Sequence, residues 1–479
     1  AGDDKMEAAC KRLLEAKKAG TAHTTITDPN DPQQIADFYT NRFLEDARKL
    51  GLKVAIEAKT DPSVMPRATD NVDGMKRMIE DLASKGFAYR PLQDGKPGDA
   101  VYFDVQKYET YGQLSGNTLN KLKGGAGGRV QDEHQAGKRH PADFLLWKSD
   151  PAHLMKWPGP TIDGDQMPEG YPGWHIECSV MSKVLGETID FHSGGEDNIF
   201  PHHECERAQS CCAHGTDTFA RHWFHPRFLL VEGEKMSKSK GNFFTARELF
   251  EKHDPAAVRL ELIKTHYRAN ANFTDDGLAS SARTIQRFRA RVAEIMYARD
   301  SEHQGRMRPE VYANDLESIL ADFADAMSSD LNVSGAIAKV GGKAIGYWDT
   351  ERDEVPDTGT PERALHDDFR SKAQKYEIPE HPLKPSEAVR LLSSDDGYDR
   401  LLGAWHLIDN ILGVIFTPQP KQTETDIGLF TGGLEPDPVV IDKLMARRDA
   451  KKAKDFATSD AIRDELAAMG YAIKDVAGG

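Results

Sequence analysis

GEKMSKSKGNF, residues 233–243, is the stretch that most constrains the fold and chemistry of this chain. It is a glycine-bounded loop rich in lysine and serine, and it lies just after the apolar run FLLV. Such a loop can close over phosphates, where Lys235 and Lys238 would neutralise charge that develops on a triphosphate as its α-phosphorus is attacked. Most lysine clusters, however, are only solvated surface loops. The segments upstream and downstream therefore have to be considered with it.

Upstream lie two segments rich in potential metal ligands, GWHIECS (173–179) and FHSGGEDNIFPHHECERAQ (191–209). His202 and Glu206 are four residues apart, so a helix after Pro201 would place both on one face. Cys178 could reach that face from the end of a neighbouring strand. Sulfur, nitrogen and oxygen donors together suit a zinc ion. Taken alone, the same cluster is equally consistent with buried polar residues of the core.

Further outward, the pattern predicts several structural regions. Between about 144 and 250, short apolar runs (FLLW, TIDF, FLLV) alternate with helical segments, as in a mostly parallel sheet covered by helices. Helical periodicity places Val72, Met75, Met78, Ile79 and Leu82 on one face of a helix over residues 71–85. Beyond 275 the pattern is that of a helix bundle, interrupted by a polar stretch at 351–398 that we interpret as a linker or surface insertion.

Composition limits the functional class. The 479 residues carry a formal charge of −15, so an RNA partner would have to meet a local basic face. The chain has neither an apolar run near the roughly 18 residues of a membrane helix nor an export signal, so we expect a cytoplasmic protein. Four of the five cysteines fall within residues 178–212 among histidines, which favours a metal site in a reducing compartment over disulfides.

Several motifs occur in the order and approximate spacing typical of one family, and on them the chain resembles cysteinyl-tRNA synthetases, which are class I aminoacyl-tRNA synthetases. The resemblance covers nearly the whole chain. It rests on GWHIECS, the GGxD segment, PHHExE and KMSKS, and on GDDKM at the start, PRATD (66–70), VYFDV, GKRHPADFLLWK (137–148), THYRANANFT (265–274) and KDFATSDAIRDEL (454–466).

This resemblance implies ATP-dependent activation of L-cysteine to cysteinyl-adenylate, followed by transfer to tRNA(Cys). One Zn²⁺ would serve as cofactor, with ATP and Mg²⁺ as substrate. The zinc would choose cysteine over serine, because an acidified sulfur is a far better zinc ligand than a neutral hydroxyl. The implied zinc ligands are Cys178, His202 and Glu206; Lys238 would contact the ATP phosphates, Trp174 would lie near the amino acid, and His192, Gly194, Gly195 and Asp197 would line the adenylate pocket.

The resemblance also implies a fold and a set of boundaries. We expect a doubly wound, Rossmann-like parallel-sheet catalytic domain with an inserted domain, then a helical bundle and a small C-terminal α+β module. The expected segments are 1–85 and 169–275 for the catalytic domain, 86–168 for the insertion, 276–430 for the bundle with its 351–398 insertion, and 431–479 for the anticodon-side module.

The chain departs from the family pattern in two places. The family's His-Ile-Gly-His motif and a fourth zinc-ligand cysteine lie upstream of the segment that matches GDDKM, so we expect the chain as written to lack cysteine-dependent pyrophosphate exchange. Cys205 stands where the family usually has Asn.

For the tRNA, MARRDAKKAK (445–454) offers a run of cations that could contact phosphates, although such runs are usually solvated faces. Two other functions stay open. One is a cysteine ligase of the mycothiol type, which would pass cysteine to an amino sugar. The other is a non-catalytic RNA-binding paralogue.

Overall fold

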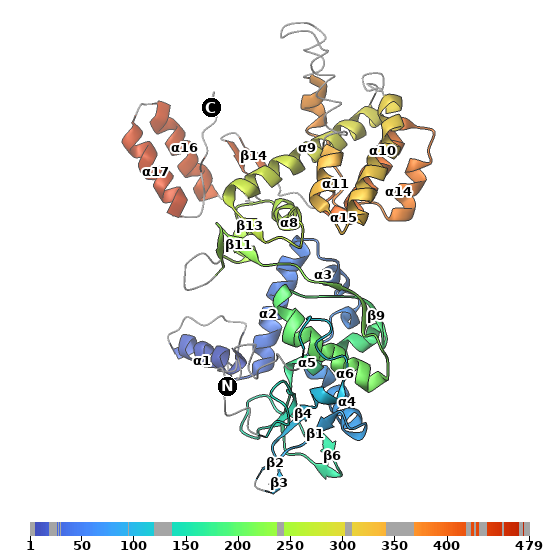
Figure 1. Cartoon of the computed structure of the whole chain (residues 1–479). Helices are drawn as coiled ribbons and strands as arrows, with labels where there is room; N and C mark the ends of the chain where they lie inside the picture. The colour runs from blue at the N-terminus through green and yellow to red at the C-terminus, as the bar shows by residue number, and fades with distance from the viewer. Residues whose placement is uncertain are drawn as a thin grey trace. The chain divides into compact units, whose positions relative to one another are not determined.

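Helices dominate the computed structural model, and its strands are short (Figure 1). It describes residues 5–18, 26, 28, 30–93, 95–118, 137–236, 244–301, 309–341, 368–417, 423–425, 428–430, 438–452, 455–468 and 473. The chain divides into two compact units, residues 1–236 with 265–272, and residues 237–264 with 273–479. The first division falls inside the expected 169–275 segment, between Met236 and Ser237.

The described part of the first unit contains six α-helices, several single turns and most of the strands. Its helices and turns are α1 (Lys5–Lys18), α2 (Pro32–Lys49), α3 (Lys53–Glu57), η1 (Pro62–Val64), η2 (Ala68–Asn71), α4 (Val72–Ser84), η3 (Val105–Lys107), α5 (Trp174–Met181), η6 (Ser182–Leu185), η7 (Glu196–Asn198), η8 (Ile199–His203) and α6 (Glu204–His214). Its strands are β1 (Ala88–Tyr89), β2 (Leu92–Gln93), β3 (Lys96–Pro97), β4 (Ala100–Phe103), β5 (Phe144–Ser149), β6 (Thr161–Ile162), β7 (Asp165–Gln166), β8 (Gly170–Pro172), β9 (Ile189–Ser193), β10 (Ala220–Phe224), β11 (Leu229–Val231) and β12 (Glu234–Lys235).

Helix α4 confirms the periodicity prediction, because all five of its predicted core residues are buried. Gly86 follows the helix with φ of +80°, a conformation that glycine adopts without a steric penalty. The helix packs against α5 and α6 and shares a hydrophobic core with β4 and β5. This core supports the segment that carries the potential metal ligands.

The first unit contains an antiparallel sheet with the order β1-β4-β5-β8, and a separate parallel pair, β9 with β10. The prediction of one mostly parallel sheet over 144–250 is therefore wrong for β5. Leu146 and Trp147 are consecutive and both fully buried, so β5 is covered on both faces. An antiparallel strand covered on both faces has the same continuous apolar sequence as a parallel one, so the run FLLW did not reveal its direction.

A hairpin leads into the lysine-rich loop. Strand β11 pairs antiparallel with β12, and β13 (Ala271–Phe273) completes a three-stranded sheet. The turn places Glu232 at φ of +49° and Gly233 at +79°, as tight hairpin turns require. The Gly233 amide donates a hydrogen bond to Asn272 Oδ1 at 2.7 Å.

In its described residues, the second unit is helical apart from one small hairpin. Its elements are α7 (Ala246–Phe250), α8 (Pro255–Ile263), α9 (Asp275–Asp300), α10 (Pro309–Ser328), α11 (Val333–Val340), α14 (Pro385–Leu392), α15 (Gly397–Leu412), β14 (Thr423–Thr425), β15 (Gly428–Phe430), α16 (Pro438–Lys452) and α17 (Phe456–Ala468). Among these, α9 and α15 make the two largest contributions to a core in which the rings of Phe288 and Trp405 are 5.4 Å apart. The helical pattern predicted beyond residue 275 is confirmed for α9 to α15, whereas α8, which lies before that point, shares the same core.

One carboxylate organises the end of α15. Asp409 is buried and accepts three backbone hydrogen bonds, from the amides of Val414, Ile415 and Phe416, at 2.7 to 2.8 Å. Arg289 donates to the carbonyl of Ile415 at 3.1 Å. The segment after α15 is therefore held firmly to the bundle.

The polar stretch at 351–398 differs from the linker prediction where it can be described. Residues 351–367 lie outside the described part of the chain. From 368 onward, Phe369, Ala373, Ile378 and Ala388 are buried, and α14 packs on α15. These apolar residues are widely spaced among charged ones, which is why composition alone suggested a linker.

The last helices, α16 and α17, pack on each other around Val440 and Leu466 (Figure 1). Among the described helices of the whole chain, none combines the length and apolarity that crossing a membrane requires.

Candidate metal and substrate site

Two of the three expected metal ligands lie on consecutive turns of one helical segment. The turn η8 runs directly into α6, so His202 and Glu206 project from the same face. His202 Nε2 lies 2.6 Å from Glu206 Oε1, and both side chains are buried.

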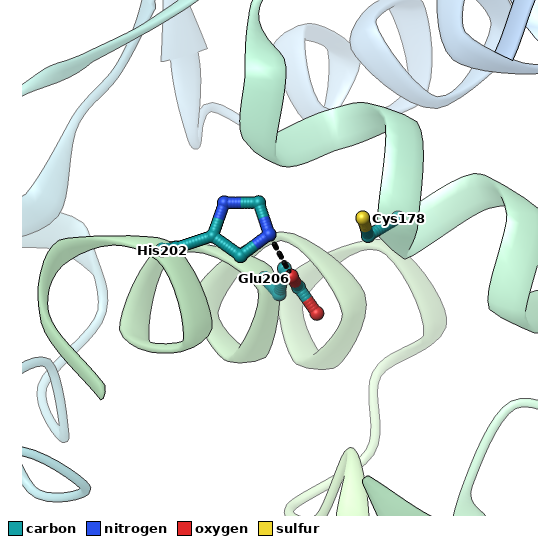
Figure 2. Close-up of side chains that lie close together, drawn as sticks. All are labelled: Cys178, His202 and Glu206. Atoms are coloured by element: carbon teal, nitrogen blue, oxygen red, sulfur yellow. Dashed lines mark ion pairs between the residues drawn. The ribbon is translucent and has the colours of Figure 1, made fainter. Parts of the chain in front are cut away.

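Cys178 completes the group from a different element than expected. It lies on helix α5, not at the end of a strand, because α5 begins immediately after β8 and packs alongside α6. Figure 2 shows Cys178 on the helix beside the one that carries His202 and Glu206. The donor atoms of Cys178, His202 and Glu206 all lie within 4.8 Å of one another.

These residues fit a bound zinc ion by two tests of the described structure. Glu206 Oε1 is buried without a hydrogen bond of good geometry from any described residue, although His202 Nε2 is near. An orphaned buried carboxylate oxygen of this kind calls for a cation or another partner. Burial, with the charge of Glu206 nearby, raises the pKa of the Cys178 thiol to about 12. A metal ion is the usual means of holding such a sulfur as thiolate at neutral pH.

Neighbouring histidines orient the group. His192 Nε2 lies 2.7 Å from Glu206 Oε2, and His175 Nδ1 lies 2.7 Å from His202 Nδ1. Burial opposes ionisation of Glu206, but the hydrogen bond with His192 and the contact with His202 outweigh it and hold the pKa at about 2. Burial, together with His202, lowers the pKa of His175 to about 3. The cluster therefore pairs an ionised carboxylate with a neutral His175, which suits metal binding.

Trp174 provides an open wall beside this group. Its ring lies 4.2 Å from that of His202, yet the residue is 50% exposed. A half-exposed aromatic side chain against a buried ligand set is a suitable surface for a small substrate side chain.

The residues expected around the adenylate lie near the same group. The His192 side chain contacts Glu206, as described above. Gly194 lies directly after strand β9. A Cβ at Gly194 would meet the His203 ring at 2.7 Å, so the backbone must pass close to that ring. Gly195 precedes η7, and Asp197 lies exposed within it.

The lysine-rich loop can be described only at its start. Lys235 is exposed on β12, with Nζ 4.8 Å from the centre of the Phe228 ring. Lys238 lies outside the described residues.

Sequence reasoning missed several residues at this site. His203 Nδ1 lies 2.8 Å from His225 Nε2, and His192, His203 and Glu206 form a second set of close donor atoms. Glu204 is fully buried in the first turn of α6. The sequence PHHECE did contain a signal for these residues, in its second histidine and its first glutamate. Polar residues this close together on a buried helix face different sides of it, so each needs its own partner. Cys205, Cys211 and Cys212 are buried free thiols.

Comparisons with known proteins agree along the chain. Residues 15–283 match the family described as tRNA synthetases class I (C) catalytic domain, and residues 442–479 match the Cysteinyl-tRNA ligase anticodon binding domain. A cysteine–tRNA ligase of Picosynechococcus sp. is 34% identical over 93% of this chain and 80% of its own length. One from Salinibacter ruber is 36% identical over 100% of this chain and 81% of its own.

Among solved structures, methionyl-tRNA synthetase of Mycobacterium tuberculosis with methionyl-adenylate aligns over 76% of this chain and 78% of its own, with 14% identity and a TM-score of 0.48. The family assignment rests on the sequence matches.

Proposed function

The chain belongs to the cysteinyl-tRNA synthetase family, and from this premise we propose how its residues carry out the reaction of a class I cysteine–tRNA ligase. L-Cysteine is activated with ATP to cysteinyl-adenylate, and the cysteinyl group passes to tRNA(Cys). The observation that best supports this function is the convergence of Cys178, His202 and Glu206 beside the half-exposed Trp174. These residues lie within the part of the chain that matches the catalytic domain.

Cys178, His202 and Glu206 would hold the zinc ion, and His175 and His192 would orient His202 and Glu206. When bound, zinc with an open position supplies a soft acceptor for a substrate thiolate, which the hydroxyl of serine matches poorly. Pocket size alone would separate cysteine from serine by only about 1–3 kcal/mol. The donor set is thus the proposed source of amino-acid selectivity, and Trp174 would limit the space beside it.

The adenylate would lie against His192, Gly194, Gly195 and Asp197. The Gly194 backbone passes close to the His203 ring, which brings this segment beside the ligand cluster and supports the placement. Lys235 and Lys238 would neutralise charge on the triphosphate, with Mg²⁺ accompanying ATP. We further propose that the parallel pair β9–β10 is part of a doubly wound catalytic sheet, with 86–168 as the inserted domain.

The match of residues 442–479 to an anticodon binding domain supports tRNA as the acceptor, in preference to an amino sugar. We propose the cytoplasm as the place of action, as for the family.

The test is ATP–pyrophosphate exchange with cysteine and with serine, followed by charging of tRNA(Cys). In a protein that joins this chain to the family's His-Ile-Gly-His motif, we expect exchange with cysteine, at least 100-fold less with serine because the hydroxyl binds zinc poorly, and charging of the tRNA. Equal exchange with both amino acids would remove zinc as the selector. In that longer protein, exchange without charging would favour the amino-sugar ligase, and the absence of both activities would favour the non-catalytic paralogue.

A further inference from the structure

Helix α6 presents two faces to different parts of the first unit. One face carries Glu206 and Gln209, and it meets α5, where Ser179 Oγ donates to Gln209 Oε1 at 2.7 Å. The other carries Glu204 and Arg207, neither of which belongs to the proposed ligand set. Glu204 is nevertheless fully buried.

The second face is occupied by the loop of residues 108–117. The backbone amide of Ser115 donates to Glu204 Oε2 at 2.9 Å, and its hydroxyl donates to the same oxygen at 3.0 Å. Arg207 Nη1 lies 3.4 Å from the other oxygen, Oε1. Both oxygens of the Glu204 carboxylate thus have a partner. Ser115, one of the two partners, is 89 residues away in the chain.

Arg207 ties the same loop a second time. It donates to the Thr110 carbonyl at 3.0 Å, to the Thr110 hydroxyl at 3.2 Å and to Gln113 Oε1 at 2.9 Å. Its guanidinium carbon also lies 5.3 Å from the centre of the Tyr108 ring. Between the two charged residues, Cys205 Sγ lies 3.5 Å from the hydroxyl of Tyr111. The loop therefore contacts the first turn of α6.

We propose that Glu204 is a positioning residue for the metal ligands, and that the loop 108–117 acts on the cysteine pocket through it. Glu204 is two residues from His202 and two from Glu206, so it fixes the turn from which both project. A fully buried carboxylate that loses its partners is costly, which makes this attachment stronger than a surface contact. The proposal rests on the zinc site proposed above and adds Glu204, Ser115 and Arg207 to the residues on which it depends.

The experiment measures zinc release from the purified protein to a chromophoric chelator. Groups that orient metal ligands typically contribute 10- to 100-fold to metal affinity, so we expect Glu204→Gln to release zinc roughly 10-fold faster. Ser115→Ala removes one of two donors and should speed release about 3-fold. The double variant should match Glu204→Gln alone, because both changes act on one contact.

A second readout separates positioning from general destabilisation. With cobalt(II) in place of zinc, the visible thiolate band reports the geometry around Cys178, and it should shift in Glu204→Gln and less in Ser115→Ala. Glu187→Gln is the matched control, because this glutamate of the same unit has a largely exposed side chain, and it should leave both readouts unchanged.

Zinc release and a cobalt spectrum like those of the wild type in a folded Glu204→Gln variant would overturn the proposal. If that variant fails to fold, unchanged zinc release from Ser115→Ala overturns it instead. A protein that joins this chain to the family's His-Ile-Gly-His motif and binds zinc, but shows no cysteine-dependent exchange, would count against the proposed function and leave the positioning role intact.

Discussion

At the residue scale, the Cys178 sulfur, as a thiolate, and the His202 imidazole are two of the three donors of the proposed zinc site. We predict that Cys178→Ser and His202→Ala each reduce bound zinc from about one per chain to near zero, because three ligands leave little affinity when one is lost. Metal analysis by mass spectrometry and cysteine binding by calorimetry measure the effect. Unchanged zinc content and cysteine binding in both variants would show that the metal, if any, is held elsewhere.

Also at this scale, Lys238 should act on the phosphates in the transition state and not on cysteine. In a complete enzyme, Lys238→Ala should lower the rate of cysteine adenylation about 100- to 1,000-fold, the usual effect of removing one electrostatic contact of this kind. The KM for cysteine should stay nearly constant. Steady-state pyrophosphate exchange separates the two parameters, and a large increase in the KM for cysteine would contradict the assigned role.

The identities of the metal ligands could be predicted from the sequence, but the elements and contacts that position them could not. The spacing of His202 and Glu206 requires only that the segment be helical, which local pattern indicates. Cys178 was placed on a strand end because nothing in GWHIECS distinguishes an α-helix from the end of β8. Glu204 and Ser115 are 89 residues apart, and only the tertiary fold brings them together.

At the scale of elements, a titratable residue, His406 of α15, contacts Leu383 in the segment just before α14. His406 is buried, its Nδ1 accepts a hydrogen bond from the Leu383 amide at 3.2 Å, and its ring stacks on Phe416. Burial lowers the pKa of His406 to about 4. Below its ordinary pKa near 6.5, the unfolded chain therefore binds a proton that the folded bundle does not.

The bundle therefore has its full stability with respect to His406 at pH 7. Part of that stability is lost as the pH falls from about 6.5 toward 4, because the unfolded chain then gains a proton at this residue. Between pH 7 and pH 5 this residue should reduce the free energy of unfolding of the bundle by about 2 kcal/mol. His406→Asn can keep an acceptor near the Leu383 amide without titrating, so its pH dependence should be flatter by that amount. Chemical denaturation at the two pH values provides the measurement, and parallel curves for both proteins would contradict the prediction.

Helices were more predictable than strands for a physical reason. The stripe of α4 and the bundle helix α9 repeat at 3.6 residues, and a helix makes its hydrogen bonds within itself. A strand depends on a partner chosen by the tertiary fold, so the run FLLW indicated burial but neither its antiparallel direction nor its neighbours β4 and β8.

At the scale of the whole molecule, an acidic chain must bind tRNA through a local basic surface. The run at 445–454 on and after α16 was expected to provide it, but Arg447 is buried, with 6% exposure, and is better placed to stabilise α16 and α17 than to contact a phosphate. Arg448 and Lys451 are partly exposed, and Lys454 lies outside the described residues.

We therefore predict different outcomes for the two kinds of cation. Replacing Arg448, Lys451 and Lys452 together with Gln should weaken tRNA binding and reduce its dependence on salt, by about one unit of slope for each phosphate that the variant can no longer neutralise. Cysteine adenylation should be unchanged. Filter binding over a range of salt concentrations measures this. Arg447→Gln should instead lower the thermal midpoint of the C-terminal helices, and unaltered tRNA affinity in the triple variant would remove this helix from the interface.

The three amides that donate to Asp409 make it possible to measure how often the second unit opens. Because Val414, Ile415 and Phe416 are buried and each amide donates to one carboxylate, they cannot exchange hydrogen with solvent by fraying one at a time. Their deuterium uptake should instead occur together, whenever the bundle around α15 opens as a whole. A single peptide spanning 413–417, followed by mass spectrometry, would then give the opening free energy of this unit separately from the unit that contains the zinc ligands.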